Sequence, residues 1–201
     1  MVAPGGLLLF HGAGGDRDHR LFLAIEAALS LPATGLSLPV ARCNFPYRDK
    51  GLGRRPPDRM PKLLESVQEH VQRCSTAWDV PSETLVLGGR SLGGRAASLA
   101  VADGLDAAGL VLLSYPLHPP GKPERLRTEH FGRLHLPVLL VQGDADPFGN
   151  RAEFDAHTPS ILGPFEQLWL EKAGHDPAAK HDAAIVGAVA GWLSKLAGSA
   201  G

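Results

Sequence analysis

The chain has 201 residues, of which 44% are hydrophobic and 20% charged, and its formal net charge is −1 at pH 7. This size predicts a single domain over residues 1–201 that can bury a core without disulfides. The near-neutral charge argues against a nucleic-acid partner, and no apolar run is long enough to cross a membrane. Only Cys43 and Cys74 could form disulfides, and no signal peptide is recognisable, so we expect a cytoplasmic protein.

Apolar runs alternate with helical patterns, which is typical of an α/β fold with a mostly parallel sheet and helices on both faces. Strands are expected at residues 7–10, 36–43, 84–87, 109–114, 138–142 and 165–170. Helices are expected near 18–30, 60–76, 92–103, 150–157 and 178–197, with Asp176 capping the last. The loops 44–61 and 115–133 should border the crevice at the carboxyl ends of the strands, and neither is long enough to form a separate cap domain.

The first expected strand ends in a glycine-rich turn, His11-Gly12-Ala13-Gly14-Gly15. Such a turn lets backbone N–H groups point into a site and stabilise an oxyanion. We expect the N–H of Ala13 to do so, and the His11 side chain to anchor the turn. No G-K-[ST] follows, which argues against a phosphate loop.

The third expected strand runs into Gly89-Arg90-Ser91-Leu92-Gly93, which fits G-x-S-x-G, and a helical pattern follows at once. Strand, tight turn and helix in this order predict a nucleophile elbow with Ser91 at its apex. The backbone N–H of Leu92 would then be the second oxyanion donor. The alternative interpretation is a glycine-rich turn whose serine merely caps a helix.

Two later segments can supply a base and an acid. The fifth expected strand ends in Gly143-Asp144-Ala145-Asp146-Pro147, and Ala173-Gly174-His175-Asp176 follows the sixth. We predict His175 as the base and Asp146 as its orienting partner, with Asp144 and His181 as their rivals. The chain order Ser, Asp, His is that of α/β-hydrolases.

Residues 42–62 carry seven Lys/Arg against two Asp/Glu, a net charge of 7 − 2 = +5. A crevice lined with positive charge would attract an anionic acyl substrate. We therefore expect Arg48, Arg90 and His118, which lies on the loop 115–133, to contact the substrate. The alternative is that these charges only face solvent. No motif for a metal or another cofactor is present, so we expect neither.

Several stretches together resemble one family: HGAGGD, CNFPYRDKG, GGRSLGGRAA, LSYPLHPPGKPERLRTEH, GDADPFG and GHD. They are similar to the small α/β-hydrolases that include testis-expressed and chromatin-complex-subunit members, and more broadly to dienelactone-hydrolase-like enzymes. The resemblance implies a three-layer fold and supports Ser91, Asp146 and His175 as the catalytic residues. It also implies that some members act as interaction modules. A serine in place of the cysteine of dienelactone hydrolase argues against dienelactone as the substrate.

The sequence therefore predicts a serine hydrolase that cleaves a carboxylic ester or related acyl bond through an acyl-enzyme. Two alternatives remain open at this point. The same residues would serve a peptidase or thioesterase, and a hydrolase fold can also act as a non-catalytic interaction module. The pattern leaves the oligomeric state undetermined.

Overall fold

One parallel sheet of six strands organises the computed structural model, which describes residues 2–30, 37–49 and 55–199. The strand order is β2-β1-β3-β4-β5-β6, and every neighbouring pair is parallel. The strands are β1 (Gly6–Phe10), β2 (Val40–Cys43), β3 (Leu85–Arg90), β4 (Gly109–Leu113), β5 (Val138–Gly143) and β6 (Phe165–Leu170). The six expected strands are thus confirmed, although the second begins only after Pro39 and the third extends to Arg90. Leu36 lies outside the described residues.

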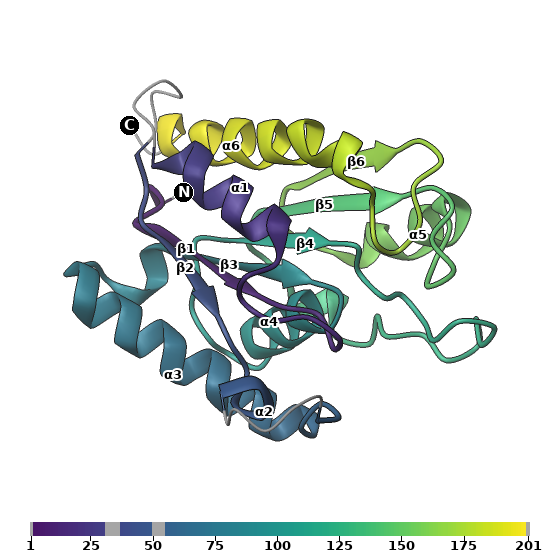
Figure 1. Cartoon of the computed structure of the whole chain (residues 1–201), viewed down its shortest axis with the longest axis horizontal. Coiled ribbons are helices and arrows are strands. Elements are labelled where there is room, and N and C mark those ends of the chain that lie inside the picture. The colour runs from purple at the N-terminus through teal and green to yellow at the C-terminus, as the bar shows by residue number, and fades with distance from the viewer. Residues whose placement is uncertain (1, 31–36, 50–54, 200–201) are drawn as a thin grey trace.

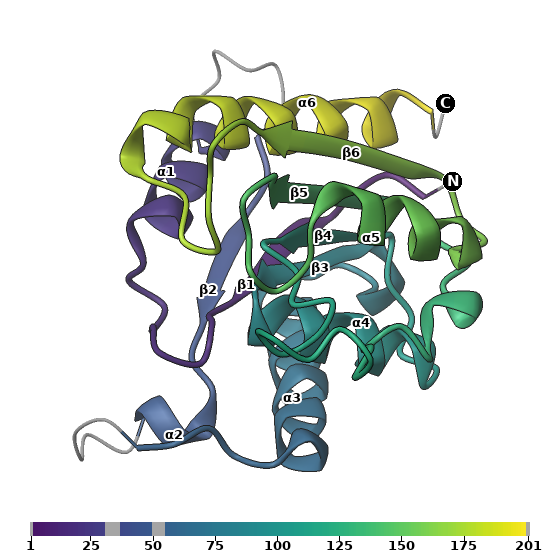
Figure 2. The ribbon, with the colours of Figure 1, turned by 90° about the vertical axis from the view of Figure 1, so that its right-hand side faces the viewer.

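Helices cover both faces of the sheet (Figures 1 and 2). On one face lie α1 (Arg20–Leu29) and α6 (Asp182–Gly198), and on the other α3 (Met60–Trp78) and α4 (Leu92–Ala102). Two shorter helices, α2 (Pro46–Asp49) and α5 (Arg151–His157), lie in the connections. The expected α/β fold, with a parallel sheet and helices on both faces, is therefore confirmed, and the described residues contain no inserted cap domain.

The central strands are apolar over most of their length because both faces of the sheet are covered. In β1, Leu8 and Phe10 pack into the core beside α3 and α4, whereas Leu7 and Leu9 pack into the core beside α1 and α6. All five β1 residues are buried, while the edge strand β6 is partly exposed. This explains why continuous apolar runs, rather than alternating ones, marked the central strands in the sequence.

The last helix begins later than expected. A single 3₁₀ turn, η5 (Ala179–His181), precedes it, so α6 starts at Asp182 and Asp176 does not cap it. Asp176 instead lies 3.1 Å from the guanidinium of Arg90. The segment after β6 thus remains at the carboxyl edge of the sheet for several residues before the chain turns back.

The loop 115–133 is held by two buried polar contacts, one within the loop and one to α4. The Tyr115 hydroxyl donates to the carbonyl of Arg127 at 2.7 Å, and Ser98 of α4 lies 2.8 Å from Nε2 of His130. Tyr115, Ser98 and His130 are all fully buried. Burial disfavours the imidazolium and lowers the pKa of His130 to about 4.

His130 should make folding stability depend on pH. The pKa of His130 is lower in the folded than in the unfolded chain, so lowering the pH protonates the unfolded chain first. The folding stability associated with the neutral ring is therefore complete above about pH 6.5 and is lost as the pH falls towards 4. We expect His130→Gln to reduce the slope of unfolding free energy against pH in this range, by at most about 1.4 kcal/mol per pH unit. Urea denaturation at several pH values measures the slope. The exposed His135 provides the control substitution, His135→Gln, and equal slopes for His130→Gln and the wild type would contradict the prediction.

Candidate active site

Ser91 occupies a strained turn between β3 and α4. Its backbone has φ 52° and ψ −114°, a conformation that costs a residue with a side chain about 1–3 kcal/mol. Its hydroxyl makes no capping hydrogen bond to the described backbone of α4, so the cap interpretation fails at this serine. The strain instead lifts the hydroxyl out of the turn at the carboxyl edge of the sheet.

The glycines of the G-x-S-x-G pattern allow two backbones to pass in contact. A Cβ at Gly93 would overlap the carbonyl of Phe10, and a Cβ at Gly89 would overlap the same oxygen. Phe10 is the last residue of β1, so the start of α4 crosses directly over the end of the neighbouring strand. Both positions therefore exclude any side chain.

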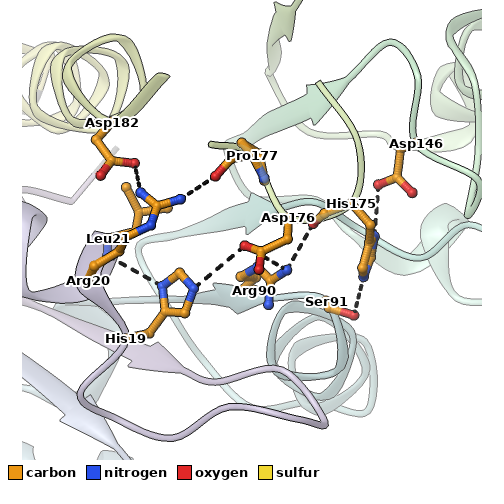
Figure 3. Close-up of polar contacts among 10 residues, drawn as sticks. All are labelled: His19, Arg20, Leu21, Arg90, Ser91, Asp146, His175, Asp176, Pro177 and Asp182. Carbon is orange, nitrogen blue, oxygen red and sulfur yellow. Dashed lines mark hydrogen bonds and ion pairs between the residues drawn. The ribbon is translucent and has the colours of Figure 1, made fainter. Parts of the chain in front are cut away.

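Three side chains from different strand ends form one hydrogen-bonded chain (Figure 3). Ser91 Oγ lies 2.8 Å from Nε2 of His175, and Nδ1 of His175 lies 2.8 Å from Oδ2 of Asp146. Because the carboxylate faces Nδ1, that nitrogen carries the proton, and Nε2 is free to accept one from the serine. The arrangement makes the hydroxyl a potential nucleophile.

Asp146 is held by more than the histidine. Its Oδ2 also accepts from the Gln142 amide at 2.7 Å, and its Oδ1 accepts from the backbone N–H of Phe148 at 2.8 Å. The carboxylate side chain is fully buried. These donors fix its orientation and stabilise its charge, so it can support a positively charged imidazole.

The rival residues lie elsewhere. Asp144 is exposed. The carboxylate that accepts a hydrogen bond from the turn backbone is that of Asp146, which accepts from the N–H of Phe148. His181 ends the 3₁₀ turn before α6, away from the residues that line the cleft around Ser91.

The ring of Phe148 stacks on His175 with centroids 4.0 Å apart, which shields one face of the imidazole.

The glycine-rich turn after β1 faces Ser91. Neither the N–H of Ala13 nor that of Leu92 donates to an acceptor within the part of the chain that the structure describes. The turn is braced by His11, whose Nδ1 lies 2.8 Å from the Gly12 carbonyl and whose Nε2 accepts from the N–H of Phe45. Burial lowers the pKa of His11, in keeping with a neutral ring that accepts this bond.

An open cleft of about 330 Å³ contains Ser91 and His175. Its lining combines the glycine-rich turn, the elbow with the start of α4, and four loops: Gly12, Ala13, Gly14, Pro57, Arg90, Ser91, Leu92, Arg95, Pro116, Arg127, Phe148 and His175. Arg95, Arg127 and Phe148 were not singled out as substrate contacts from the sequence. Arg95 could have been, because it lies four residues after Ser91 and so on the same side of the helix start.

Two of the expected substrate contacts do not line this cleft. Arg48 donates to the carbonyls of Gly15 at 2.8 Å and Ala13 at 3.2 Å, so it braces the glycine-rich turn instead. His118 is buried and lies 3.2 Å from the carboxylate of Glu153.

The basic segment 42–62 also differs from expectation, since Pro57 is the one described residue of it in the cleft lining. Arg42 forms ion pairs with Asp18 and Glu26, and Lys62 pairs with Asp58. Lys50 and Arg54 lie outside the described residues.

Arg90 lines the cleft, but its charge is already engaged (Figure 3). Its guanidinium donates to the carbonyl of His175 at 3.0 Å and lies 3.1 Å from Asp176. Burial lowers the pKa of Arg90, and the Asp176 carboxylate counteracts that effect. Asp176 also faces His19, at 3.8 Å. The Arg90 side chain therefore ties the segment that carries His175 to the end of β3, directly before Ser91.

Among the described residues, no group of three or more His, Cys, Asp or Glu side chains is placed to hold a metal ion. None of the described helices combines the length and apolar character needed to cross a membrane.

Comparisons with known proteins identify the family and the fold. A family model described as an alpha/beta hydrolase domain matches residues 4–185. The fold is similar to that of Est1E from Butyrivibrio proteoclasticus with ferulic acid bound, at a TM-score of 0.78 and 16% identity, covering 96% of this chain and 90% of that one.

Two further solved structures share the fold. A dienelactone hydrolase from Anabaena variabilis has a TM-score of 0.71 and 17% identity, with 96% of this chain and 88% of that one covered. A monoacylglycerol lipase from Paleococcus ferrophilus has a TM-score of 0.71 and 15% identity, with 97% and 96% covered. At these identities the likeness concerns the fold alone.

The contact between the elbow and β1 can be tested with one methyl group. Gly93→Ala would force the Phe10 carbonyl and the start of α4 apart, so we expect a loss of roughly 1–3 kcal/mol of unfolding free energy. Gly191→Ala is the matched control, because it lies in α6 with no heavy atom within 4 Å of the added Cβ. That substitution should raise stability by about 0.5–1 kcal/mol. Denaturant titration compares the two, and equal shifts would disprove the close packing.

Proposed function

The chain belongs to the alpha/beta hydrolase family, and from that premise we propose that it is a serine hydrolase acting on a carboxylic ester or a related acyl bond. The observation that carries this proposal is the 2.8 Å contact between Ser91 Oγ and His175 Nε2 at the apex of a strained turn. Such strain persists only where the surrounding structure enforces it, and it is concentrated at functional sites. This favours catalysis over a non-catalytic interaction module.

The first half of the reaction would acylate the serine. Ser91 Oγ attacks the carbonyl carbon while His175 Nε2 takes the hydroxyl proton, and the Asp146 carboxylate stabilises the resulting imidazolium. The carbonyl oxygen becomes an oxyanion that the N–H groups of Ala13 and Leu92 would bind. Each such donor contributes about 3–4 kcal/mol to stabilising the transition state. The imidazolium then protonates the departing alcohol, and an acyl-Ser91 ester remains.

The second half would restore the enzyme with water. His175 Nε2 accepts a proton from the water as its oxygen attacks the acyl carbon, and the second oxyanion forms at the same two N–H groups. Collapse breaks the bond to Ser91 Oγ, and the imidazolium returns its proton to that oxygen. The cleft opens to solvent, so water can reach the acyl-enzyme without a separate channel.

Two finer assignments accompany this proposal. We propose a cytoplasmic protein, supported by two free and buried thiols, Cys43 and Cys74. We also propose that the chain lies within the small branch with testis-expressed and chromatin-complex-subunit members, supported by the LSYPLHPPGKPE stretch.

The nucleophile can be identified by covalent labelling. A fluorophosphonate should modify Ser91 alone, and Ser91→Ala should abolish labelling and reduce ester hydrolysis by at least about 10⁴-fold. Ser98→Ala provides a matched control, because Ser98 also lies 2.8 Å from a histidine Nε2 but is fully buried away from the cleft. Mass spectrometry locates the label, and undiminished turnover in Ser91→Ala would refute the proposed function.

The two neighbouring aspartates should behave differently. Asp146→Asn replaces an oxygen that accepts from Nδ1 with a group that cannot hold the imidazole tautomer, so kcat should fall by about 10⁴-fold. Asp144→Asn, at an exposed position, should leave kcat and Tm close to those of the wild type. Steady-state kinetics and thermal unfolding on both variants give the comparison. A large loss of kcat in Asp144→Asn would show that the wrong acid has been assigned.

A further inference from the structure

Two arginines that line the cleft form no ion pair with the described residues. Arg95 and Arg127 both line the cleft that contains Ser91, and no carboxylate of the described residues forms an ion pair with either. Nε of Arg95 is buried and has no hydrogen-bond partner among those residues. Within the described part of the chain, the Arg127 side chain makes a single hydrogen bond, a long one of 3.5 Å to the Pro116 carbonyl. Their guanidinium groups are therefore available to a ligand.

Other arginines near the site have polar partners within the protein, although Nε of Arg90, like that of Arg95, is buried with no partner among the described residues. Arg90 is held by Asp176 and the His175 carbonyl, and Arg48 by the carbonyls of the glycine-rich turn (Figure 3 shows the Arg90 contacts). Those two side chains serve the framework of the site.

The electrostatics of the cleft also point to an anion. Its described lining holds three arginines, and no aspartate or glutamate is among the described lining residues. The N-terminus of α4, an 11-residue helix that begins at Leu92, adds a partial positive charge at the same place. Burial lowers the pKa of Arg127, and the nearby charge of Arg95 lowers it further. An anion between the two guanidinium groups would relieve this repulsion.

The backbone positions both side chains firmly. Arg95 lies on the first turn of α4, and its N–H donates to the Ser91 carbonyl at 3.0 Å. Arg127 donates its N–H to the Leu117 carbonyl at 2.8 Å, and its own carbonyl accepts from the buried Tyr115 hydroxyl at 2.7 Å. Both side chains therefore extend from backbone that is held in place on the wall of the cleft.

Their place in the cleft separates them from the leaving-group side. A second hollow of about 490 Å³ adjoins the cleft and shares Arg95 and Arg127 with it. Glu124 and Arg125 also line this hollow, but His175 and Phe148 do not. Arg95 and Arg127 therefore lie where the cleft meets this hollow, and an ester whose alcohol faces His175 would extend its acyl chain towards them.

We propose that Arg95 and Arg127 form an anion subsite, and that the substrate is an ester whose acyl chain carries a carboxylate or a phosphate group. This inference rests on the proposed hydrolase function and specifies its substrate class. Arg95 follows Ser91 by four residues, about one turn of α4, so an anionic group at Arg95 would belong to a short acyl chain whose carbonyl lies at Ser91. Planar guanidinium groups suit both anions, which offer paired oxygens.

Matched methyl esters test the subsite. The probes are the monomethyl esters of C4 to C6 dicarboxylic acids, the same esters with a terminal carboxamide, and methyl 4-phosphonobutanoate. We expect kcat/KM for the best anionic ester to exceed that of its neutral carboxamide at least tenfold. Comparison of the carboxylate and phosphonate esters then distinguishes the two anions. The preference should shrink as salt rises from 0.05 to 0.5 M, because the Debye length shortens.

Neutral variants of similar length assign the preference to the two residues. Arg95→Met and Arg127→Met should each lower the anionic-to-neutral ratio of kcat/KM about tenfold or more, and Arg95→Lys should restore part of it. Arg133→Met, at a surface arginine paired with Asp103, should leave the ratio unchanged. A wild-type ratio near one, or equal losses on both esters in the two variants, would overturn the subsite.

A binding measurement keeps the subsite separate from the hydrolase function. In the Ser91→Ala protein, glutarate should raise Tm, glutaramide should not, and Arg127→Met should remove the shift. Labelling of Ser91 without any anion preference would overturn the subsite but leave the hydrolase intact. Binding of glutarate through Arg95 and Arg127 in a protein that cleaves no ester would support the subsite and contradict the proposed function.

Discussion

The contact of the α4 start with the end of β1 is the constraint on which the rest of the site depends. Gly93 and Gly89 let the helix backbone reach the Phe10 carbonyl, and only this approach leaves Ser91 at the top of the sheet with φ 52°. The residues that follow β1 form the glycine-rich turn, which lines the same cleft as the serine. The positions of Ser91 and of the N–H groups that we propose as oxyanion donors therefore depend on one contact between a strand and a helix.

Charged side chains at this edge differ in whether the fold already supplies their partners. Arg90, Arg48 and Asp146 each have several partners within the protein, and each holds a backbone segment or a ring in place. The side chains of Arg95 and Arg127 have few partners among the described residues and line the cleft, which is why we propose that they contact a ligand. A positive charge count along the sequence does not reveal this division, because it depends on which carboxylates and carbonyls come close in space.

The sequence predicted the strands and the hydrogen-bonded chain well because local signals specify them: apolar runs for buried strands, and glycines around Ser91. It failed where long-range partners decide. Arg42 pairs with Asp18 and Glu26. His118 is buried beside Glu153, and Asp176 pairs with Arg90 instead of capping α6. The exposed Asp144 and the buried Asp146 differ only by two positions, and the Gln142 and Phe148 donors that separate them become visible only in the fold.

The buried link between α4 and the loop 115–133 has a consequence for how substrate range can change. Ser98 of α4 contacts His130 of the loop, and Tyr115 holds the backbone of Arg127 within the loop, so the wall of the cleft is built jointly by a helix and a loop that contact each other. Grafting the loop from another hydrolase onto this scaffold would remove His130 and leave the buried Ser98 hydroxyl without this partner. Diversification of this cleft by recombination therefore requires helix and loop to be inherited together, whereas point substitutions at the tips of the side chains remain free.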